Sequence, residues 1–444
     1  MLPARSHTLR AMHALLAGMR SRSERARLRS CTAHRPLRIA RQQRDLLHPT
    51  VRPAGQVPAK VIDENGKTPL HYAAFAGRIG VARLLLDADP SALAIVSPVD
   101  GYTPLLDALV SEHAEVSALL IKSSHADLTA TDINGHSVLF HAARFQTASL
   151  VRAVLKTKEL SVADVNAAGK RTKFTALHAA SLEGQDESVE LLLAAGANVH
   201  ARDMEASMPL HLVAQREVGG ARVVELLVRA GANVSARMET ENSKSVTALH
   251  LAANKGNIGV VEALLEAGAS LHAKDKIGRT PLVAAIAKGT AAMVALLLKR
   301  GASAKEFRSA FNFTALHFAA GQGKQDIIDV LVGPGEMEID AVDNRISRAT
   351  ALHYAAGEVW LCLPCSDLIR EGTPFVAAGK GNVKGVKALL RHKPNLSKRD
   401  GYNVTALHYA AQSGSAALVR ALLQAGADLT IKGPRGFTPM DFAA

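Results

Sequence analysis

Aromatic residues, cysteines and long apolar runs are all scarce in this chain of 444 residues. Aromatic residues make up 4% of it, so small aliphatic side chains must fill the interior, which suits thin layers of helices better than one thick globule. Three cysteines cannot build a disulfide framework, and no apolar run reaches the roughly 18 residues that span a bilayer. We therefore expect no transmembrane segment and a reducing, intracellular setting.

Motifs of the common enzyme classes are also missing. Gly372 and Gly379 have the look of a phosphate-binding loop, but six residues separate them where that loop has four. Cys362 and Cys365 form a C-x-x-C pair without a second such pair, and neither H-E-x-x-H nor G-x-S-x-G occurs. The sequence therefore predicts no enzyme, no cofactor, no metal site and no small-molecule substrate. An enzyme that uses the Cys362 region is the competing hypothesis.

Most of the positive charge lies in the first sixty residues. The formal net charge is +13, and residues 1–60 contribute 12 Arg and one Lys against Glu24 and Asp45, which is +11. The other 384 residues therefore carry +2. We expect residues 1–60 to be disordered. Three interpretations of them stay open: an organelle transit peptide, a basic tail that touches acidic partners or nucleic acid, or upstream sequence wrongly included in the reading frame.

One short pattern recurs along the rest of the chain, most often at a step of 33 residues. It consists of a Thr, or a Ser or Met in its place, followed by an apolar run with paired Ala. Seven copies carry a Leu-His pair two residues after the first position: Leu70-His71, Leu177-His178, Leu210-His211, Leu249-His250, Leu316-His317, Leu352-His353 and Leu407-His408. Histidines at one fixed position of each repeat are expected to be structural rather than catalytic.

Each part of the pattern predicts a local structure. Thr68, Thr280 and Thr438 stand where a helix N-cap is expected, because Pro follows each of them and tolerates the first helical position. A Gly then turns the chain into a second helix. A Gly-Ala step, as at Gly268, ends that helix. Tips such as 63–66, Asp-Glu-Asn-Gly, predict a tight hairpin before the next unit.

The repeated Thr-Pro-Leu-His-x-Ala pattern resembles the ankyrin repeat family. The resemblance implies an all-α solenoid of about ten helix-turn-helix units with β-hairpin connections over residues 61–444, preceded by the disordered segment. It also implies a non-catalytic scaffold or adaptor that binds another protein on the concave face formed by hairpin tips and first helices. The alternative is a regulatory subunit tethered to membrane or nucleic acid by the basic tail. We expect a cytoplasmic location, or a mitochondrion or other organelle if residues 1–60 are a transit peptide.

Four predicted tips depart from the plain Asp-x-x-Gly form and are the candidate partner site, because aromatic and Arg residues anchor many interfaces. A Phe just before a helix can instead pack on its neighbour. The candidates are Lys170, Arg171 and Phe174; Glu239 and Glu241; Phe307, Arg308, Phe311 and Phe313; and Arg345 and Arg348.

Two places break the period. Residues 357–378 add 22 residues inside one unit, including the only Trp. We hypothesise a retained intron translated in frame; the alternative is a genuine degenerate repeat that starts at Gly372. Sequencing the transcripts would decide between them. The last copy, at 433–444, is incomplete and is expected to stop within its first helix.

Overall fold

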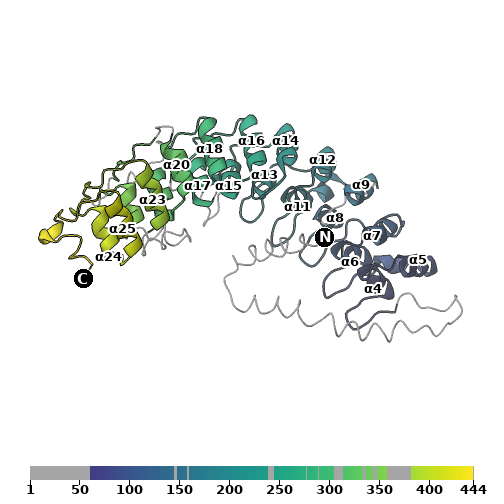
Figure 1. Ribbon diagram of the computed structural model, residues 1–444. Coiled ribbons are helices and arrows are strands. Elements are labelled where there is room, and N and C mark those ends of the chain that lie inside the picture. The colour runs from purple at the N-terminus through teal and green to yellow at the C-terminus, as the bar shows by residue number, and fades with distance from the viewer. Residues whose placement is uncertain are drawn as a thin grey trace. The chain divides into compact units, whose positions relative to one another are not determined.

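The computed structural model describes residues 61–443, except 145–147, 158–159, 239–244, 277, 289, 305–313, 334–336, 344–347 and 358–381. Ten helix pairs follow one another along this part of the chain (Figure 1). Their bounds are α4 (Pro69–Phe75) and α5 (Ile79–Ala88), α6 (Pro104–Val110) and α7 (Ala114–Ile121), α8 (Val138–Arg144) and α9 (Ala148–Lys156), α11 (Ala176–Glu183) and α12 (Asp186–Ala194), α13 (Pro209–Ala214) and α14 (Ala221–Arg229), α15 (Ala248–Lys255) and α16 (Ile258–Glu266), α17 (Pro281–Lys288) and α18 (Ala291–Lys299), α19 (Ala315–Gln322) and α20 (Gln325–Val332), α21 (Ala351–Ala356) and α23 (Val383–Arg391), and α24 (Ala406–Gln412) and α25 (Ala416–Gln424).

The helices stack in two rows. The first helix of each pair contacts the first helix of the next, from α4 on α6 to α21 on α24, and second helices pack likewise, as α12 does on α14. One continuous apolar core runs between the rows, and the Leu of every Leu-His pair is buried in it. The predicted all-α solenoid of about ten units is therefore confirmed.

The connections between units are tighter than regular β-hairpins. Within the described residues, strands pair only at β1 (Arg237–Met238) with β2 (Val246–Thr247), and single bridges join Thr131 to Ser137 and Val342 to Thr350. Elsewhere an Asp closes the tip, as where Oδ1 of Asp63 accepts the N–H groups of Asn65 and Lys67. A carboxylate that accepts backbone N–H groups replaces part of a strand ladder.

The predicted N-caps vary with the residue three positions later. Thr68 caps α4 through its side chain, with Pro69 in the first turn and His71 completing a capping box. The hydroxyl of Thr280 has no hydrogen-bond partner among the described residues, since Val283 occupies the position of the His. Thr438 begins a hydrogen-bonded turn instead of the expected helix, and its N–H donates to Asp441.

The seven Leu-His histidines link each unit to the next. In each, Nδ1 accepts the N–H of the residue at the Thr position, at 3.0–3.3 Å. Because a backbone N–H can only donate, the ring proton must lie on Nε2. Nε2 then donates to a backbone carbonyl that leads into the following unit, at 3.0–3.3 Å. These two hydrogen bonds give each histidine the structural role that the sequence predicts.

In the unit that contains the 22 additional residues 357–378, one backbone hydrogen bond joins the residues on either side of the added segment. In five other units an N–H at the start of the second helix donates to an Ala carbonyl five residues earlier, as from Arg78 to Ala73. The equivalent bond here runs from Asn382 N–H to Ala355 O at 2.7 Å, 27 residues apart. The excess is 22 residues, the length of 357–378. This supports the proposal that a normal unit carries an insertion; Trp360, Cys362 and Cys365 lie outside the described residues.

We predict that deleting residues 357–378 leaves the array folded, with a free energy of unfolding changed by less than about 1 kcal/mol, because loop length alone has a small entropic effect. The deletion places Gly381 in the slot that Gly77 fills with a φ of 68°. A matched deletion of 361–382 removes the same number of residues but puts Val359 in that slot and loses Asn382. Urea denaturation should find this control clearly less stable. Equal stability of the two deletion variants would contradict the proposed insertion.

Candidate partner-binding ridge

Four consecutive tips are joined into one surface by backbone hydrogen bonds. We call residues 99–102, 132–136, 169–174 and 203–206 the tip ridge. The joining bonds are Ile133 N–H to Asp100 O at 3.0 Å, Lys170 N–H to Asn134 O at 2.7 Å and Met204 N–H to Thr172 O at 3.1 Å. Because each tip is held to its neighbour, side chains on four different units keep fixed spacing, as an interface requires.

The tip ridge exposes both apolar and basic side chains. Val99, Ile133 and Met204 are 52%, 60% and 67% exposed. Lys170, Arg171 and Lys173 are exposed on the tip between the last two. Large apolar side chains within reach of Arg on a fixed surface are typical of protein interfaces.

The Lys170–Phe174 tip is the one described tip that carries three of the predicted site residues. Lys170 and Arg171 face solvent, whereas Phe174 is half-buried and its ring lies 5.3 Å from that of His178. The half-buried ring of Phe174 therefore packs on its own unit and also offers an exposed edge. Its role in binding stays a prediction.

The other predicted site residues are not brought together with this tip. Arg348 is exposed on the separate tip before α21. The remaining candidates lie outside the described residues: Glu239, Glu241, Phe307, Arg308, Phe311, Phe313 and Arg345.

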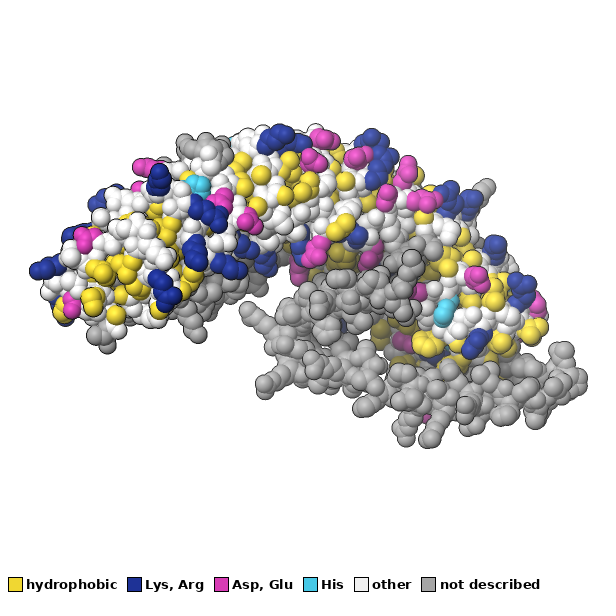
Figure 2. All heavy atoms as spheres, viewed as in Figure 1, with side chains coloured by type: hydrophobic (Ala, Val, Ile, Leu, Met, Phe, Trp, Pro, Cys, Tyr) yellow, Lys and Arg dark blue, Asp and Glu magenta, His cyan; other side chains and the backbone are white. Residues whose placement is uncertain are grey.

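Sequence reasoning missed all three exposed apolar residues of the ridge, Val99, Ile133 and Met204. Ile133 and Met204 are each the second residue of a tip that begins with Asp, in Asp132-Ile133 and Asp203-Met204. A tip of this form exposes its second position, so an apolar residue there is the signal that could have found them. Charge points to only one tip of the ridge, at Lys170 and Arg171, and Figure 2 shows Lys and Arg mixed with Asp and Glu along the visible face of the described array.

On two tips of the ridge, a residue other than glycine adopts a left-handed backbone conformation. The residue two before the Thr position has positive φ in every unit with a described tip, and Gly66, Gly101 and Gly135 fill it in the first three. Lys173 and Ala206 fill it on the tip ridge with φ of 58° and 54°. A side chain in the left-handed region costs about 1–2 kcal/mol. Ser245, Arg348 and Asn403 fill the same position on tips outside the ridge, so this strain is not specific to the ridge.

Replacing Lys173 with Gly should therefore raise the free energy of unfolding by about 0.5–1 kcal/mol. The matched control is Lys170→Gly on the same tip, which removes the same charge at a position where φ is not positive. We expect that control to lower stability, because Gly gains backbone entropy in the unfolded state. Thermal denaturation of both variants is the measurement, and stabilisation by Lys170→Gly but not Lys173→Gly would refute the strain argument.

The ridge carboxylates titrate differently. Burial raises the pKa of Asp203 to about 6, against two hydrogen bonds from the backbone of its own tip. Burial also opposes ionisation of Asp132, but hydrogen bonds from His136 and His141 outweigh it and hold the pKa of that carboxyl well below its usual range.

Among the described helices, none has the length and apolar composition to cross a membrane.

Comparison with known proteins agrees with this architecture. A family model described as ankyrin repeats matches residues 45–132, 118–203, 210–308 and 364–433. The mouse B-cell lymphoma 3 protein homolog is 31% identical over 208 residues, covering 47% of this chain and 46% of that protein. The probable 26S proteasome regulatory subunit p28 of Saccharomyces cerevisiae is 36% identical over 107 residues, 24% of this chain and 47% of the relative. Human transient receptor potential cation channel subfamily A member 1 is 29% identical over 462 aligned residues, 91% of this chain and 40% of the channel.

The alignments thus span less than half the length of each of these three relatives. The family model, in contrast, matches more than half of this chain, in segments that include most of the stacked helix pairs, while α19, α20 and α21 lie between the third and fourth segments. Ankyrin repeats are generally modules for protein–protein interaction. With its Leu-His framework and its ten stacked pairs, the chain belongs to the ankyrin repeat family.

Proposed function

We propose that this protein is a non-catalytic scaffold or adaptor that binds another protein on its hairpin tips and first helices, with the tip ridge as the central contact. The observation that supports this most is the exposure of Val99, Ile133 and Met204 on tips that are bonded to one another. Exposed apolar side chains at fixed spacing gain most when a partner removes them from water.

The charge on the ridge favours one class of partner. Lys170, Arg171 and Lys173 are exposed at its centre, while Glu205 is the exposed acid beside them. A partner segment with apolar side chains flanked by Asp or Glu complements this surface. Two of the relatives are named as subunits of larger proteins or assemblies, the nuclear factor NF-kappa-B p105 subunit of chicken and the proteasome subunit p28. These names support our proposal of an adaptor role for this chain.

The test compares two double variants of the full chain after proximity labelling has identified a partner. Arg171→Ala with Met204→Ala removes an Arg and an apolar side chain from the ridge. Arg83→Ala with Leu84→Ala removes the same chemistry from α5, where Leu84 is 71% exposed. We expect the ridge variant to raise the Kd at least about tenfold and the α5 variant to leave it unchanged. An unchanged Kd for the ridge variant, at unchanged stability, would place the partner elsewhere.

The alternative function, a regulatory subunit tethered by the basic tail, stays a prediction because residues 1–60 lie outside the described residues. The same holds for the domain boundary at residue 60 and for the cellular compartment. Salt-sensitive binding to nucleic acid or acidic membranes that disappears on deleting residues 1–60 would support the tether.

A further inference from the structure

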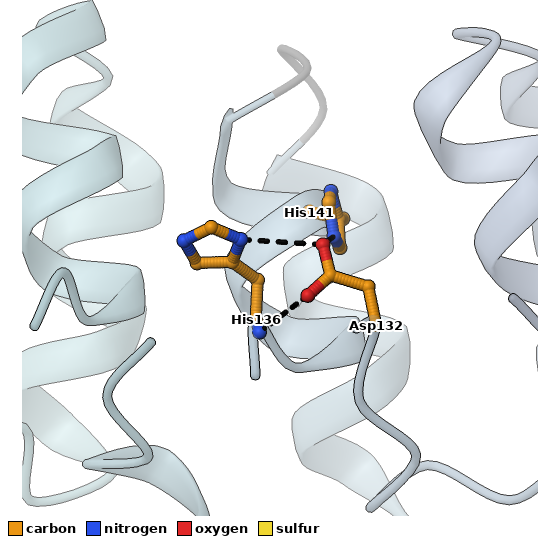
Figure 3. Close-up of side chains that lie close together, drawn as sticks. All are labelled: Asp132, His136 and His141. Atoms are coloured by element: carbon orange, nitrogen blue, oxygen red, sulfur yellow. Dashed lines mark hydrogen bonds and ion pairs between the residues drawn. The ribbon is translucent and has the colours of Figure 1, made fainter. Parts of the chain in front are cut away.

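Two imidazoles converge on one carboxylate at the second tip of the ridge (Figure 3). Nδ1 of His136 and Nε2 of His141 each lie 3.2 Å from Oδ2 of Asp132. The three groups come from two elements, the tip 132–136 and helix α8. Asp132 and His141 are buried and His136 is half-buried, so the cluster is shielded but reachable from solvent.

Part of this arrangement is a feature of the repeat. The residue at the position of His141 is Tyr72, Tyr354 or Tyr409 in three other units, and each Tyr hydroxyl donates to the Asp that opens its own tip. A contact from this helix position to the Asp of the tip is therefore part of the structural framework of the repeat. The difference in the α8 unit is that both groups facing the Asp are imidazoles, each of which has a nitrogen lone pair to offer a cation, whereas a Tyr hydroxyl serves there as a donor.

The geometry fits a transition-metal ion. Two imidazoles and a carboxylate are donors that zinc commonly takes, with bonds of about 2.0–2.1 Å that place neighbouring ligand atoms roughly 3.4 Å apart in a tetrahedron. Both measured nitrogen-to-oxygen distances are 3.2 Å, and all three ligand atoms lie within 4.8 Å of one another. Small side-chain rotations would close the set around one ion.

Further contacts orient the ligands. Nε2 of His136 lies 3.2 Å from Oγ1 of Thr172 on the next tip, and its ring stacks on Phe140 with centroids 4.3 Å apart. Oδ1 of Asp132 accepts the backbone N–H of His136 at 2.8 Å, which leaves Oδ2 for the imidazoles. Hydrogen bonds of this kind, from the far nitrogen of a metal-binding imidazole, hold its ring in place in known metal sites.

We propose that Asp132, His136 and His141 bind one zinc ion through Oδ2, Nδ1 and Nε2. The ion takes the place of the two N–H protons that face the carboxylate: the proton of His136 moves to Nε2, where Thr172 Oγ1 accepts it, and that of His141 moves to Nδ1. Three protein ligands leave a coordination position for water or for a partner side chain. Because Thr172 belongs to the Lys170–Phe174 tip, zinc would also hold two tips of the ridge together.

The experiment is a zinc titration of the full chain by isothermal titration calorimetry, with melting temperature as a second readout. His141→Tyr is the central variant, because the chain itself uses Tyr at this position in three other units and the fold should be kept. His136→Gln tests the tip ligand, and His125→Gln changes an exposed His away from the cluster. Histidines in residues 1–60 are common to all four proteins, so their zinc uptake cancels in the comparison.

We expect the wild type and His125→Gln to bind one zinc ion that the other two variants bind at least about tenfold more weakly. Zinc should raise the melting temperature of the first two only, because the ion binds the folded chain. No difference in zinc uptake between wild type and both His141→Tyr and His136→Gln would overturn the proposal, as would a wild type that binds none. If one variant fails to fold, the other decides.

Discussion

Lowering the pH from 7.5 to 5 should destabilise the array steeply, well before ordinary carboxylates are protonated. Burial lowers the pKa of the framework histidines His71, His178, His211 and His317 to about 4, and hydrogen bonds to the backbone carbonyls offset only part of that. Burial lowers the pKa of His250, His353 and His408 in the same direction. These histidines are neutral in the folded chain because Nδ1 must accept a backbone N–H.

The direction follows from proton binding. The unfolded histidines have a pKa near 6.5, so between about pH 6.5 and pH 4 the unfolded chain binds more protons than the folded chain. Stability is then fully present above pH 6.5 and is lost as the pH falls through that window. Within this window each such histidine changes the free energy of unfolding by about 1.4 kcal/mol per pH unit. The four histidines whose pKa is about 4 together change it by about 5 kcal/mol per pH unit.

Three carboxylates oppose this trend, since burial raises the pKa of Asp107, Asp203 and Glu183. Burial raises the pKa of Asp107 to about 6, against its ion pair with Lys67, and that of Asp203 to about 6. Their folded forms take up protons first, which adds stability as the pH falls through 6. Three such groups are outnumbered by seven histidines, so the net effect remains a loss of stability.

The measurement is the urea midpoint at several pH values between 7.5 and 5 for wild type, His178→Gln and the exposed control His125→Gln. We expect the midpoint to fall with pH in all three, with a smaller slope in His178→Gln by about one proton. A midpoint that stays level or rises between pH 6.5 and pH 5 would mean that the framework histidines are protonated in the folded chain.

Leu249→Ala should lower the free energy of unfolding by about 2–5 kcal/mol, because Leu249 is fully buried in α15 and truncation leaves a cavity. In a stacked array this loss acts on the central units and their neighbours. Calorimetric melting is the measurement.

Two controls accompany this variant. Leu84→Ala removes an exposed Leu from a second helix and should change stability by less than about 0.5 kcal/mol. Leu9→Ala lies in the basic tail and should have almost no effect. A shift for Leu9→Ala equal to that of Leu249→Ala would contradict the proposed boundary at residue 60.

The fold could be predicted from the sequence because its determinants are local and repeated. The Leu-His pair and the Gly after the first helix recur most often at a step of 33 residues, and each keeps the same physical role in the units that carry it. The acceptors of the histidine Nε2 protons could not be assigned in the same way, since Tyr102 or Ala349 supplies only a backbone carbonyl. Their positions depend on how one unit packs on the next.

The candidate site was less predictable. Lys170 and Arg171 could be named from charge, but the backbone bonds that join their tip to Asn134 and Met204 carry no side-chain signal. The Asp132 cluster escaped because Phe140 takes the usual His position in its unit and moves the imidazole to the next residue, His141. The prediction of no metal site rested on linear motifs, whereas this cluster forms only when a tip folds back on its helix.

The proposal that the tips bind a protein partner is tested most directly by hydrogen–deuterium exchange of the full chain, alone and with its partner. We expect the partner to slow exchange at residues 99–102, 132–136, 169–174 and 203–206 and to leave exchange in the second helices α12 and α14 unchanged. Protection on those second helices, with unaltered exchange at the four tips, would contradict it.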